Sequence, residues 1–232
     1  MLFVAELGLN HDGNFDLAYE MIRRAKAADA DVAKFQFGWR DKPDEINCID
    51  KERAMQLRRW CDFHEIEMLA SVIKPEAFEL AEAAGIARYK VASRTVVDYP
   101  DLIRKLIDSG KEVFVSLGFW DGDDWPFGPP TEKLRYIFCR SKYPSYPEDM
   151  IGMPERFSDD GYYGYSCHYH GSAAALTAAA RGARFIEKHF TLNKSSQVIR
   201  DHTLSATPEE FAEMVRLGRE IGRLNRVIDG DT

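Results

Sequence analysis

The sequence of 232 residues has no run of 18 apolar residues, few cysteines and no surplus of basic side chains. Without such an apolar run, no segment is predicted to span a membrane. Acidic residues outnumber basic ones by 38 to 31, and the formal net charge is −7. This balance argues against general nucleic-acid binding, which needs a basic face. A small anionic substrate stays compatible, because a few local lysines outweigh a diffuse negative surface.

The four cysteines show no CxxC pairing; they are Cys48, Cys61, Cys139 and Cys167. In a chain of this length, we expect reduced thiols rather than a disulfide framework. The first residues, MLFVAELGLNHDG, contain no basic segment, no long apolar run and no small-residue cleavage site, so they are not typical of a signal peptide. We therefore expect a cytoplasmic protein.

Short β-rich runs alternate with amphipathic helical stretches. The predicted strands are Leu2–Gly8, Asp31–Phe37, Glu67–Val72, Arg88–Ser93, Glu112–Gly118, Arg135–Ser141, Tyr162–Cys167 and Arg184–Phe190. The predicted helices are Asp16–Ala28, Lys51–His64, Pro75–Ala84, Tyr99–Ser109, Gly171–Arg181 and Pro208–Leu224. Alternating elements imply parallel strands joined by right-handed crossovers. They predict one α/β domain over residues 1–232, a (β/α)8 TIM barrel. An open doubly wound sheet is the main alternative, but no GxGxxG turn supports it.

One unit of this pattern is irregular. Residues 119–131 read FWDGDDWPFGPPT, which is too rich in glycine, proline and aspartate for a normal helix. We expect a loop there, which either covers a substrate or simply replaces a truncated helix. Several prolines in residues 141–155 predict that the sixth helix is short.

Polar residues recur at the carboxyl ends of the predicted strands, where the active sites of such barrels gather. A barrel interior is normally packed with branched apolar side chains, and burying many unpaired polar groups is costly. This pattern therefore favours a site over coincidence. The residues are Glu6, Asn10, His11, Lys34, Gln36, Lys90, Ser93, Ser116, Ser141, Ser166, His168, Glu187 and His189.

Two histidines, His168 and His189, end adjacent predicted strands. Neighbouring strands lie about 4.8 Å apart, so both imidazoles can reach one ion. Two neutral imidazoles suit a first-row divalent metal whose shell is completed by water or a substrate oxygen. Cys167 and His170 suggest a larger cluster, but strand alternation points Cys167 away from His168 and favours a packing role for it.

Lys34 and Lys90, with hydroxyls nearby, predict a pocket for phosphate or carboxylate, for which lysine serves as a point charge. The structural alternative is a salt bridge from Lys34 to Glu6 or Glu187.

Several motifs together point to a known family. They are AELGLNHDGN at 5–14, DVAKFQF at 31–37, YKVAS at 89–93, SLG at 116–118, CRSKYP at 139–144, GYSCH at 164–168, IEKHFTL at 186–192 and DHTLSATPEEF at 201–211. In this order, they resemble the barrel domain of the sialic acid synthases, the N-acetylneuraminate synthase family with its legionaminic and pseudaminic acid relatives. That family condenses phosphoenolpyruvate with an amino-sugar aldehyde to give a 2-keto sugar acid and phosphate.

The resemblance implies a role for each matched residue. His168 and His189 match two histidines that hold a divalent metal, usually Mn²⁺ or Mg²⁺. Positions that hold the phosphate and carboxylate are matched by Lys34, Lys90, Ser93, Ser116 and Ser166. Glu6 and Gln36 match polar residues near the reacting groups, and Tyr143 matches a substrate-side tyrosine. Asn10 and Ser141, at strand ends, complete the expected substrate site.

The sequence also departs from the family. The motif YKIGSGE reads YKVASRT here, so Thr95 stands at the position of a catalytic glutamate, and threonine cannot act as a carboxylate base. Arg94 replaces a glycine beside it. In GYSCHY, Cys167 replaces an aspartate, which removes a hydrogen-bond acceptor that helps to orient a metal ligand. The chain ends at Thr232, so we expect no antifreeze-like domain after the barrel.

Three functions follow from these observations. The first is a metal-assisted condensation of phosphoenolpyruvate with a sugar-derived aldehyde, and it is favoured by Lys34, Lys90, His168 and His189. The second, motivated by Thr95, is a barrel that binds a phosphorylated ligand or partner without catalysis. The third is another metal-assisted aldol or lyase reaction, since fold does not fix function. A homodimer is the default expectation for the assembly.

Overall fold

The computed structural model describes residues 1–229 and contains a closed barrel of eight parallel strands. Each strand pairs with the next along the chain, and β8 returns to pair with β1. The strands are β1 (Leu2–Glu6), β2 (Val32–Phe37), β3 (Glu67–Val72), β4 (Tyr89–Val91), β5 (Val113–Ser116), β6 (Leu134–Cys139), β7 (Tyr162–Cys167) and β8 (Phe185–His189). The predicted (β/α)8 barrel is confirmed, and the open sheet is excluded.

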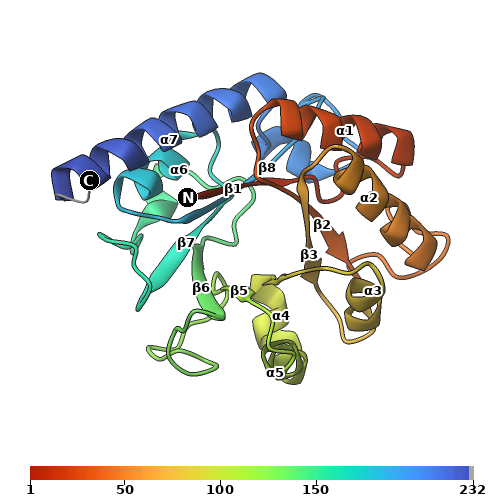
Figure 1. Ribbon diagram of the computed structural model, residues 1–232, viewed down its shortest axis with the longest axis horizontal. Helices are drawn as coiled ribbons and strands as arrows, with labels where there is room; N and C mark the ends of the chain where they lie inside the picture. The colour runs from red at the N-terminus through yellow and green to blue at the C-terminus, as the bar shows by residue number, and fades with distance from the viewer. Residues whose placement is uncertain (230–232) are drawn as a thin grey trace.

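Helices surround this barrel (Figure 1). They are α1 (Phe15–Ala27), α2 (Lys51–Phe63), α3 (Ala77–Ala83), α4 (Ser93–Asp98), α5 (Pro100–Asp108), α6 (Ala173–Ala180) and α7 (Pro208–Asp229), with two 3-10 turns, η1 (Pro147–Met150) and η2 (Arg200–Leu204). α1 begins where the Asn14 side chain accepts hydrogen bonds from the backbone N–H groups of Asp16 and Leu17. No helix in residues 1–229 has both the length and the apolar character needed to cross a bilayer.

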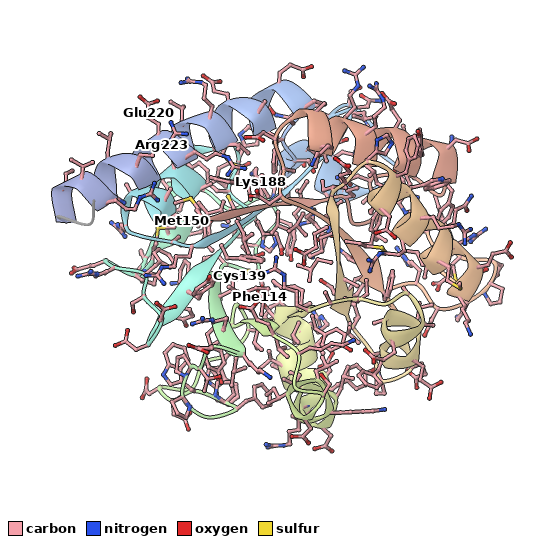
Figure 2. The ribbon with its side chains drawn as sticks, in the orientation of Figure 1. Phe114, Cys139, Met150, Lys188, Glu220 and Arg223 are labelled. Carbon is pink, nitrogen blue, oxygen red and sulfur yellow. The ribbon has the colours of Figure 1, made fainter. Side chains whose placement is uncertain are left out.

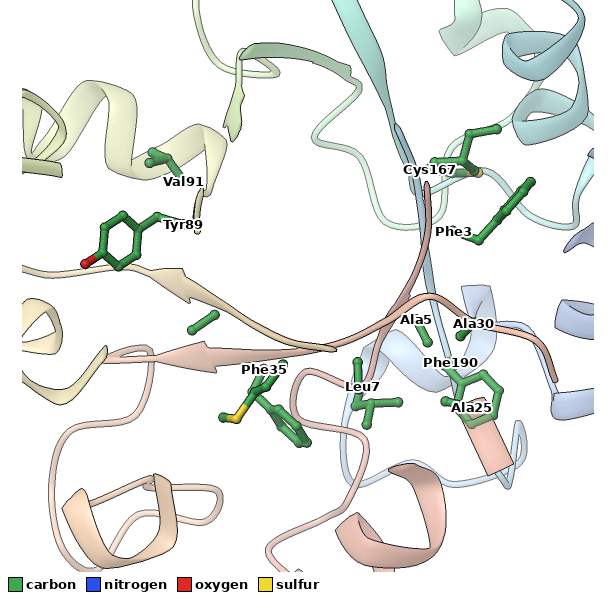
Figure 3. Packing of buried hydrophobic residues seen from close by; sticks show 14 of the residues in the cluster. Phe3, Ala5, Leu7, Ala25, Ala30, Phe35, Tyr89, Val91, Cys167 and Phe190 are labelled. Atoms are coloured by element: carbon green, nitrogen blue, oxygen red, sulfur yellow. The ribbon is translucent and has the colours of Figure 1, made fainter. Parts of the chain in front are cut away.

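Most of the hydrophobic core lies between the strands and the helices. The outward side chains of β1, Phe3 and Ala5, pack in one cluster with Ala25 of α1 and with Phe190 just after β8 (Figure 3). All four are fully buried. This packing fixes the outer face of each strand, and strand alternation then directs the intervening residues into the barrel.

The barrel interior has two layers of different character. Val4, Val32, Leu69, Phe114, Ile137 and Phe185 form a separate buried apolar cluster. Two residues further along the same strands stand Glu6, Lys34, Ser71, Ser116, Cys139 and Glu187. Because side chains two apart in a strand share a face, the polar set lies directly above the apolar set, toward the carboxyl ends. The fold thus seals one end of the barrel and makes the other polar.

Several predicted strands extend beyond their true carboxyl ends. The strand predicted over Arg88–Ser93 ends at Val91, and Ser93 already begins α4, a helix that was not predicted. Thr95, Val96 and Val97 are β-branched and lower helix propensity, but burial of Thr95 and Val96 selects the helix. β1 likewise ends at Glu6 instead of Gly8, whose φ of +49° leaves the extended region.

The irregular segment at 119–131 is a loop, as predicted. The indole of Trp125 stacks on the ring of Tyr136 in β6 with centroids 4.5 Å apart. The Tyr136 hydroxyl donates a hydrogen bond of 2.8 Å to the Gly128 carbonyl. These contacts attach the loop to the outer face of β6, where it takes the place of a helix. Of its residues, Phe119 reaches the cavity described below. After β6, η1 (Pro147–Met150) confirms the short sixth helix.

Candidate active site

A cavity of about 890 Å³ opens at the carboxyl ends of the strands. Its size suits one drug-sized ligand or two small ones. Of the predicted site residues, those lining it are Glu6, Lys34, Gln36, Lys90, Ser93, Ser116, Ser141, Tyr143, Ser166, His168 and His189. Cys139 of β6, another lining residue, lies within the ring of strands, whereas Glu220 and Arg223 lie on the outer surface of α7 (Figure 2).

Three predicted residues, Asn10, His11 and Thr95, do not line this cavity. Asn10 is buried, and its Nδ2 donates hydrogen bonds of 2.9 Å to the Phe190 carbonyl and to Ser205 Oγ. The Thr95 hydroxyl donates to the Ile73 carbonyl over 3.1 Å and is 1% exposed. Both side chains hold loops together at the mouth of the barrel. The structure therefore places Asn10 and Thr95 in hydrogen bonds beside the cavity and not in its lining.

Four charged side chains form a buried network at the floor of the cavity. The ammonium of Lys34 forms a salt bridge with Glu6, and its Nζ lies 3.6 Å from Glu187 Oε2. Lys90 Nζ lies 3.9 Å from the same Glu187 oxygen. All four side chains are at most 5% exposed. The salt bridge kept open as the alternative to an anion pocket is therefore present, with both glutamates as partners.

Within this network the pKa values of the two glutamates shift in opposite directions, and so do those of the two lysines. Burial raises the pKa of Glu6 to about 6 against the attraction of Lys34. Burial also opposes ionisation of Glu187, but the charges of Lys34 and Lys90 prevail and lower its pKa to about 2. Burial lowers the pKa of Lys90, whereas the two carboxylates overcome burial and raise that of Lys34. Glu187 is thus a fixed anion, and Glu6 can exchange a proton near neutral pH.

Hydroxyl groups surround the two lysines. Lys34 Nζ donates to Ser71 Oγ over 2.8 Å, and Lys90 Nζ donates to Ser116 Oγ over 2.6 Å. Ser166 Oγ donates to Glu187 over 2.8 Å. Ammonium and hydroxyl donors that converge in a dry cavity can bind phosphate or carboxylate oxygens.

A glycine keeps another hydroxyl in place. The backbone N–H of Gly118 donates to Ser93 Oγ over 2.9 Å. A Cβ atom at Gly118 would lie 2.4 Å from Ser141 Oγ and 2.9 Å from Ser93 Oγ. Any larger residue would therefore displace both hydroxyls, which explains the glycine in the SLG motif.

The two predicted histidines lie together at the cavity wall. Their ring centroids are 5.4 Å apart, and both side chains are about 95% buried. Burial lowers the pKa of each to about 3, so both imidazoles are neutral at physiological pH. The Tyr143 ring lies against His168 with centroids 4.0 Å apart.

The hydrogen bonds of this pair suit a metal ion. His168 Nδ1 lies 2.9 Å from the Arg140 carbonyl, which can only accept, so Nε2 keeps its lone pair. His189 Nδ1 is buried without a hydrogen-bond partner in residues 1–229, and Asp201 Oδ2 is 3.8 Å away. The Arg140 carbonyl is thus an acceptor that orients the His168 ring. Cys167 itself lies in the outer core, as predicted.

The protein offers few side chains that could bind a metal ion at this position. Among residues 1–229, no group of three or more histidine, cysteine, aspartate or glutamate side chains is arranged to hold a metal ion. A divalent ion at His168 and His189 would therefore take its other ligands from water or substrate oxygens, which is the arrangement of an open, reactive site.

Several lining residues were not predicted as site residues. Glu187 was predicted as a polar strand-end residue and as a salt-bridge partner but was given no role toward a substrate, and Ser71 was not considered. The signal for Ser71 was its place two residues after buried Leu69 in β3. At the rim, Arg40, Arg94 and Arg200 line the cavity from segments beyond the strand ends, whose course the sequence does not reveal.

Comparison with known proteins adds an independent line of argument. The profile of the NeuB family matches residues 44–226. The uncharacterized protein MJ1065 of Methanocaldococcus jannaschii is 32% identical, over 91% of this chain and 68% of its own length. Human N-acetylneuraminate-9-phosphate synthase is 30% identical, over 95% of this chain and 70% of its own. Among solved structures, the N-acetylneuraminic acid synthetase of Leptospira borgpetersenii has a TM-score of 0.82 at 26% identity, covering 96% of this chain and 84% of that one.

Proposed function

The chain belongs to the NeuB family, and from this premise we propose that it condenses phosphoenolpyruvate with a sugar-derived aldehyde to give a 2-keto sugar acid and phosphate. The family includes an N-acetylneuraminate-9-phosphate synthase and a pseudaminic acid synthase. The observation that carries the proposal is one cavity that joins the Lys34 and Lys90 anion pocket to the neutral His168 and His189 pair.

Phosphoenolpyruvate would occupy the floor of the cavity. Its phosphate and carboxylate oxygens would accept hydrogen bonds from Lys34 and Lys90 and from the hydroxyls of Ser93, Ser116 and Ser166. Glu187 holds both ammonium groups in place when no substrate is bound, so the site is organised before phosphoenolpyruvate arrives.

The aldehyde would lie toward the two histidines. A Mn²⁺ or Mg²⁺ ion held by His168 and His189 would polarise the aldehyde oxygen. C3 of phosphoenolpyruvate forms the new bond to the aldehyde carbon, and the aldehyde oxygen takes up a proton. Water then adds to C2 and loses one proton. The C2–O bond to phosphate breaks, and the new hydroxyl gives its remaining proton to the departing phosphate and becomes the 2-keto group.

Glu6 is the best candidate for the base that accepts the proton of this water. Among the buried carboxylates at the floor, Glu187 is too acidic at a pKa of about 2, whereas Glu6 has a pKa of about 6. Gln36 Nε2 donates to Glu6 Oε1 over 2.9 Å and positions the carboxylate. This assignment places the general base away from Thr95.

The test is release of inorganic phosphate from phosphoenolpyruvate in the presence of Mn²⁺ and a panel of aldoses. We expect release with at least one aldose, a product mass equal to the aldose plus pyruvate, and loss of both signals in His189→Ala. His170→Ala, which removes an exposed histidine nearby, is the matched control. Silence across the panel, with phosphoenolpyruvate still bound in calorimetry, would instead support the binding barrel suggested by Thr95.

A further inference from the structure

Three arginines ring the mouth of the cavity above the deep site. Arg40 lies three residues beyond β2, Arg94 lies three residues beyond β4, and Arg200 begins η2 after β8. All three line the same cavity as Lys34 and His189. They project from a loop, from helix α4 and from η2, so no shared helix or turn accounts for their convergence.

The charges of this rim, defined as Arg40, Arg94 and Arg200, are incompletely balanced. In residues 1–229, Arg94 has no carboxylate within ion-pair distance, and its guanidinium lies 5.2 Å from the Phe119 ring centroid. Arg200 lies 4.8 Å from the centroid of the Tyr143 ring, and its contact with Asp201 is 3.5 Å long. Aromatic rings hold these cations in position without neutralising them.

Arg40 also has an N–H donor that makes no hydrogen bond in residues 1–229. Its Nη1 lies 3.6 Å from Glu45, while its Nε is buried without a hydrogen-bond partner in residues 1–229. The neighbouring Asp41 is bound by Lys74 over 2.5 Å and does not compensate Arg40. A buried donor without a partner costs free energy, so a ligand oxygen that accepts a hydrogen bond from Arg40 Nε would be stabilised there.

The local charge contrasts with the whole chain. The cavity lining has five basic side chains and three acidic ones, whereas the chain has a net charge of −7. On the floor, Lys34 and Lys90 are balanced by Glu6 and Glu187. The surplus therefore lies at the rim, farther out than the groups assigned to phosphoenolpyruvate.

From these observations we infer that the aldehyde substrate carries a negatively charged group, a phosphate monoester or a carboxylate, at the end remote from its aldehyde carbon, and that Arg40, Arg94 and Arg200 bind this group. The inference rests on the proposed condensation, in which the aldehyde carbon lies deep beside His168 and His189. The remote end of an extended aldose then reaches the rim. Guanidinium groups bind both anions through paired N–H donors.

The test compares aldoses that differ at one carbon: mannose, mannose 6-phosphate and mannuronate, and N-acetylmannosamine with its 6-phosphate. Binding is measured by calorimetry with phosphoenolpyruvate and Mn²⁺ present, and turnover is measured by loss of phosphoenolpyruvate. We expect at least one charged aldose to bind at least 30-fold more tightly than its neutral counterpart. We expect this preference to weaken as salt is raised.

Variants assign the preference to the rim. Arg94→Gln and Arg200→Gln should each weaken binding of the charged aldose about tenfold or more, with affinity for phosphoenolpyruvate retained. Arg104→Gln, which removes an exposed arginine outside the cavity, should change neither. Equal binding of neutral and charged aldoses would overturn the inference. So would variants that weaken phosphoenolpyruvate instead, because the arginines would then serve that substrate.

The two proposals fail separately. Turnover of neutral and charged aldoses at equal efficiency would keep the condensation and remove the charged acceptor. Selective, arginine-dependent binding of a charged aldose without turnover would remove the condensation and keep the rim as an anion site.

Discussion

The Nζ atom of Lys34 lies 3.6 Å from Oε2 of Glu187 inside the barrel, where both side chains are at most 5% exposed. Glu187 also contacts Lys90 and accepts a hydrogen bond from Ser166. One carboxylate therefore contacts both buried ammonium groups, and Lys90 has no other carboxylate within 4 Å in residues 1–229. Removing one partner of a buried pair leaves an uncompensated charge, which is more costly than the pair is worth.

Glu187→Gln should accordingly lower the free energy of unfolding by about 3 kcal/mol, because the amide keeps the shape but not the charge. Urea unfolding measures the loss, and Glu209→Gln on the exposed surface of α7 is the control. Inorganic phosphate should recover part of the loss by supplying the missing negative charge. An unchanged urea midpoint in Glu187→Gln would contradict this account.

The barrel and most of its polar floor were predictable for one physical reason. In a strand, side chains two residues apart share a face, so Glu6 above Val4 and Lys34 above Val32 could be placed from the sequence. Motif resemblance then suggested the proposed reaction. Strand alternation does not predict where a side chain goes once the strand has ended, so it could not show that Thr95 and Asn10 lie outside the cavity lining.

The positions of the rim arginines could not be predicted for the same reason. Arg40, Arg94 and Arg200 lie beyond the ends of three strands, where no periodic pattern fixes a side chain, and only the folded chain brings them to one mouth. α4 was missed for a related reason: its β-branched residues favour a strand locally, and tertiary burial decides otherwise.

The metal assignment predicts a direct binding result. Wild-type protein should bind Mn²⁺ in a titration followed by electron paramagnetic resonance, because both imidazoles are neutral and retain lone pairs. His168→Ala or His189→Ala should weaken binding at least about 100-fold, since loss of an outer partner alone costs 10- to 100-fold. His170→Ala should bind like wild type. Equal Mn²⁺ affinity in all four proteins would place the ion elsewhere.

The opposite end of the barrel is closed by alternating charges. Arg88 Nε donates to Glu67 over 2.6 Å, and Arg88 Nη1 donates to Glu112 over 3.2 Å. Arg135 continues the chain of ion pairs between Glu112 and Asp159, and Asp159 also pairs with Arg184. These residues precede or begin consecutive strands from β3 to β8, so the ion pairs link neighbouring strands where the barrel is sealed.

Arg88→Met should therefore lower the free energy of unfolding by about 1.5–3 kcal/mol, the usual value of hydrogen bonds to charged groups. The side chain of Arg88 is 20% exposed, so solvent screens it only in part. Arg104→Met, at a site 61% exposed, should change stability by less than about 0.5 kcal/mol. Thermal or urea unfolding distinguishes the two, and equal stabilities would show that the ion pairs of Arg88 contribute nothing to stability.

His11 provides a pH-dependent test of packing outside the cavity. It is fully buried, neither ring nitrogen has a hydrogen-bond partner in residues 1–229, and its ring lies 5.0 Å from that of Phe15. Burial lowers the pKa of His11 to about 4 from an ordinary value of 6.5. Between these values the unfolded chain binds more protons than the folded one. The free energy of unfolding is therefore highest above pH 6.5, where His11 is neutral in both states, and it decreases as the pH falls toward 4.

At pH 5, this loss amounts to about 2 kcal/mol relative to pH 8. Urea unfolding at both pH values should show it in the wild type, and the loss should be smaller by that amount in His11→Leu. His168 and His189 also have lowered pKa values and add the same dependence to both proteins, so the difference between wild type and variant isolates His11. Parallel pH profiles would show that His11 stays uncharged in the unfolded chain too, or is protonated without cost in the folded one, and either result would refute the burial argument.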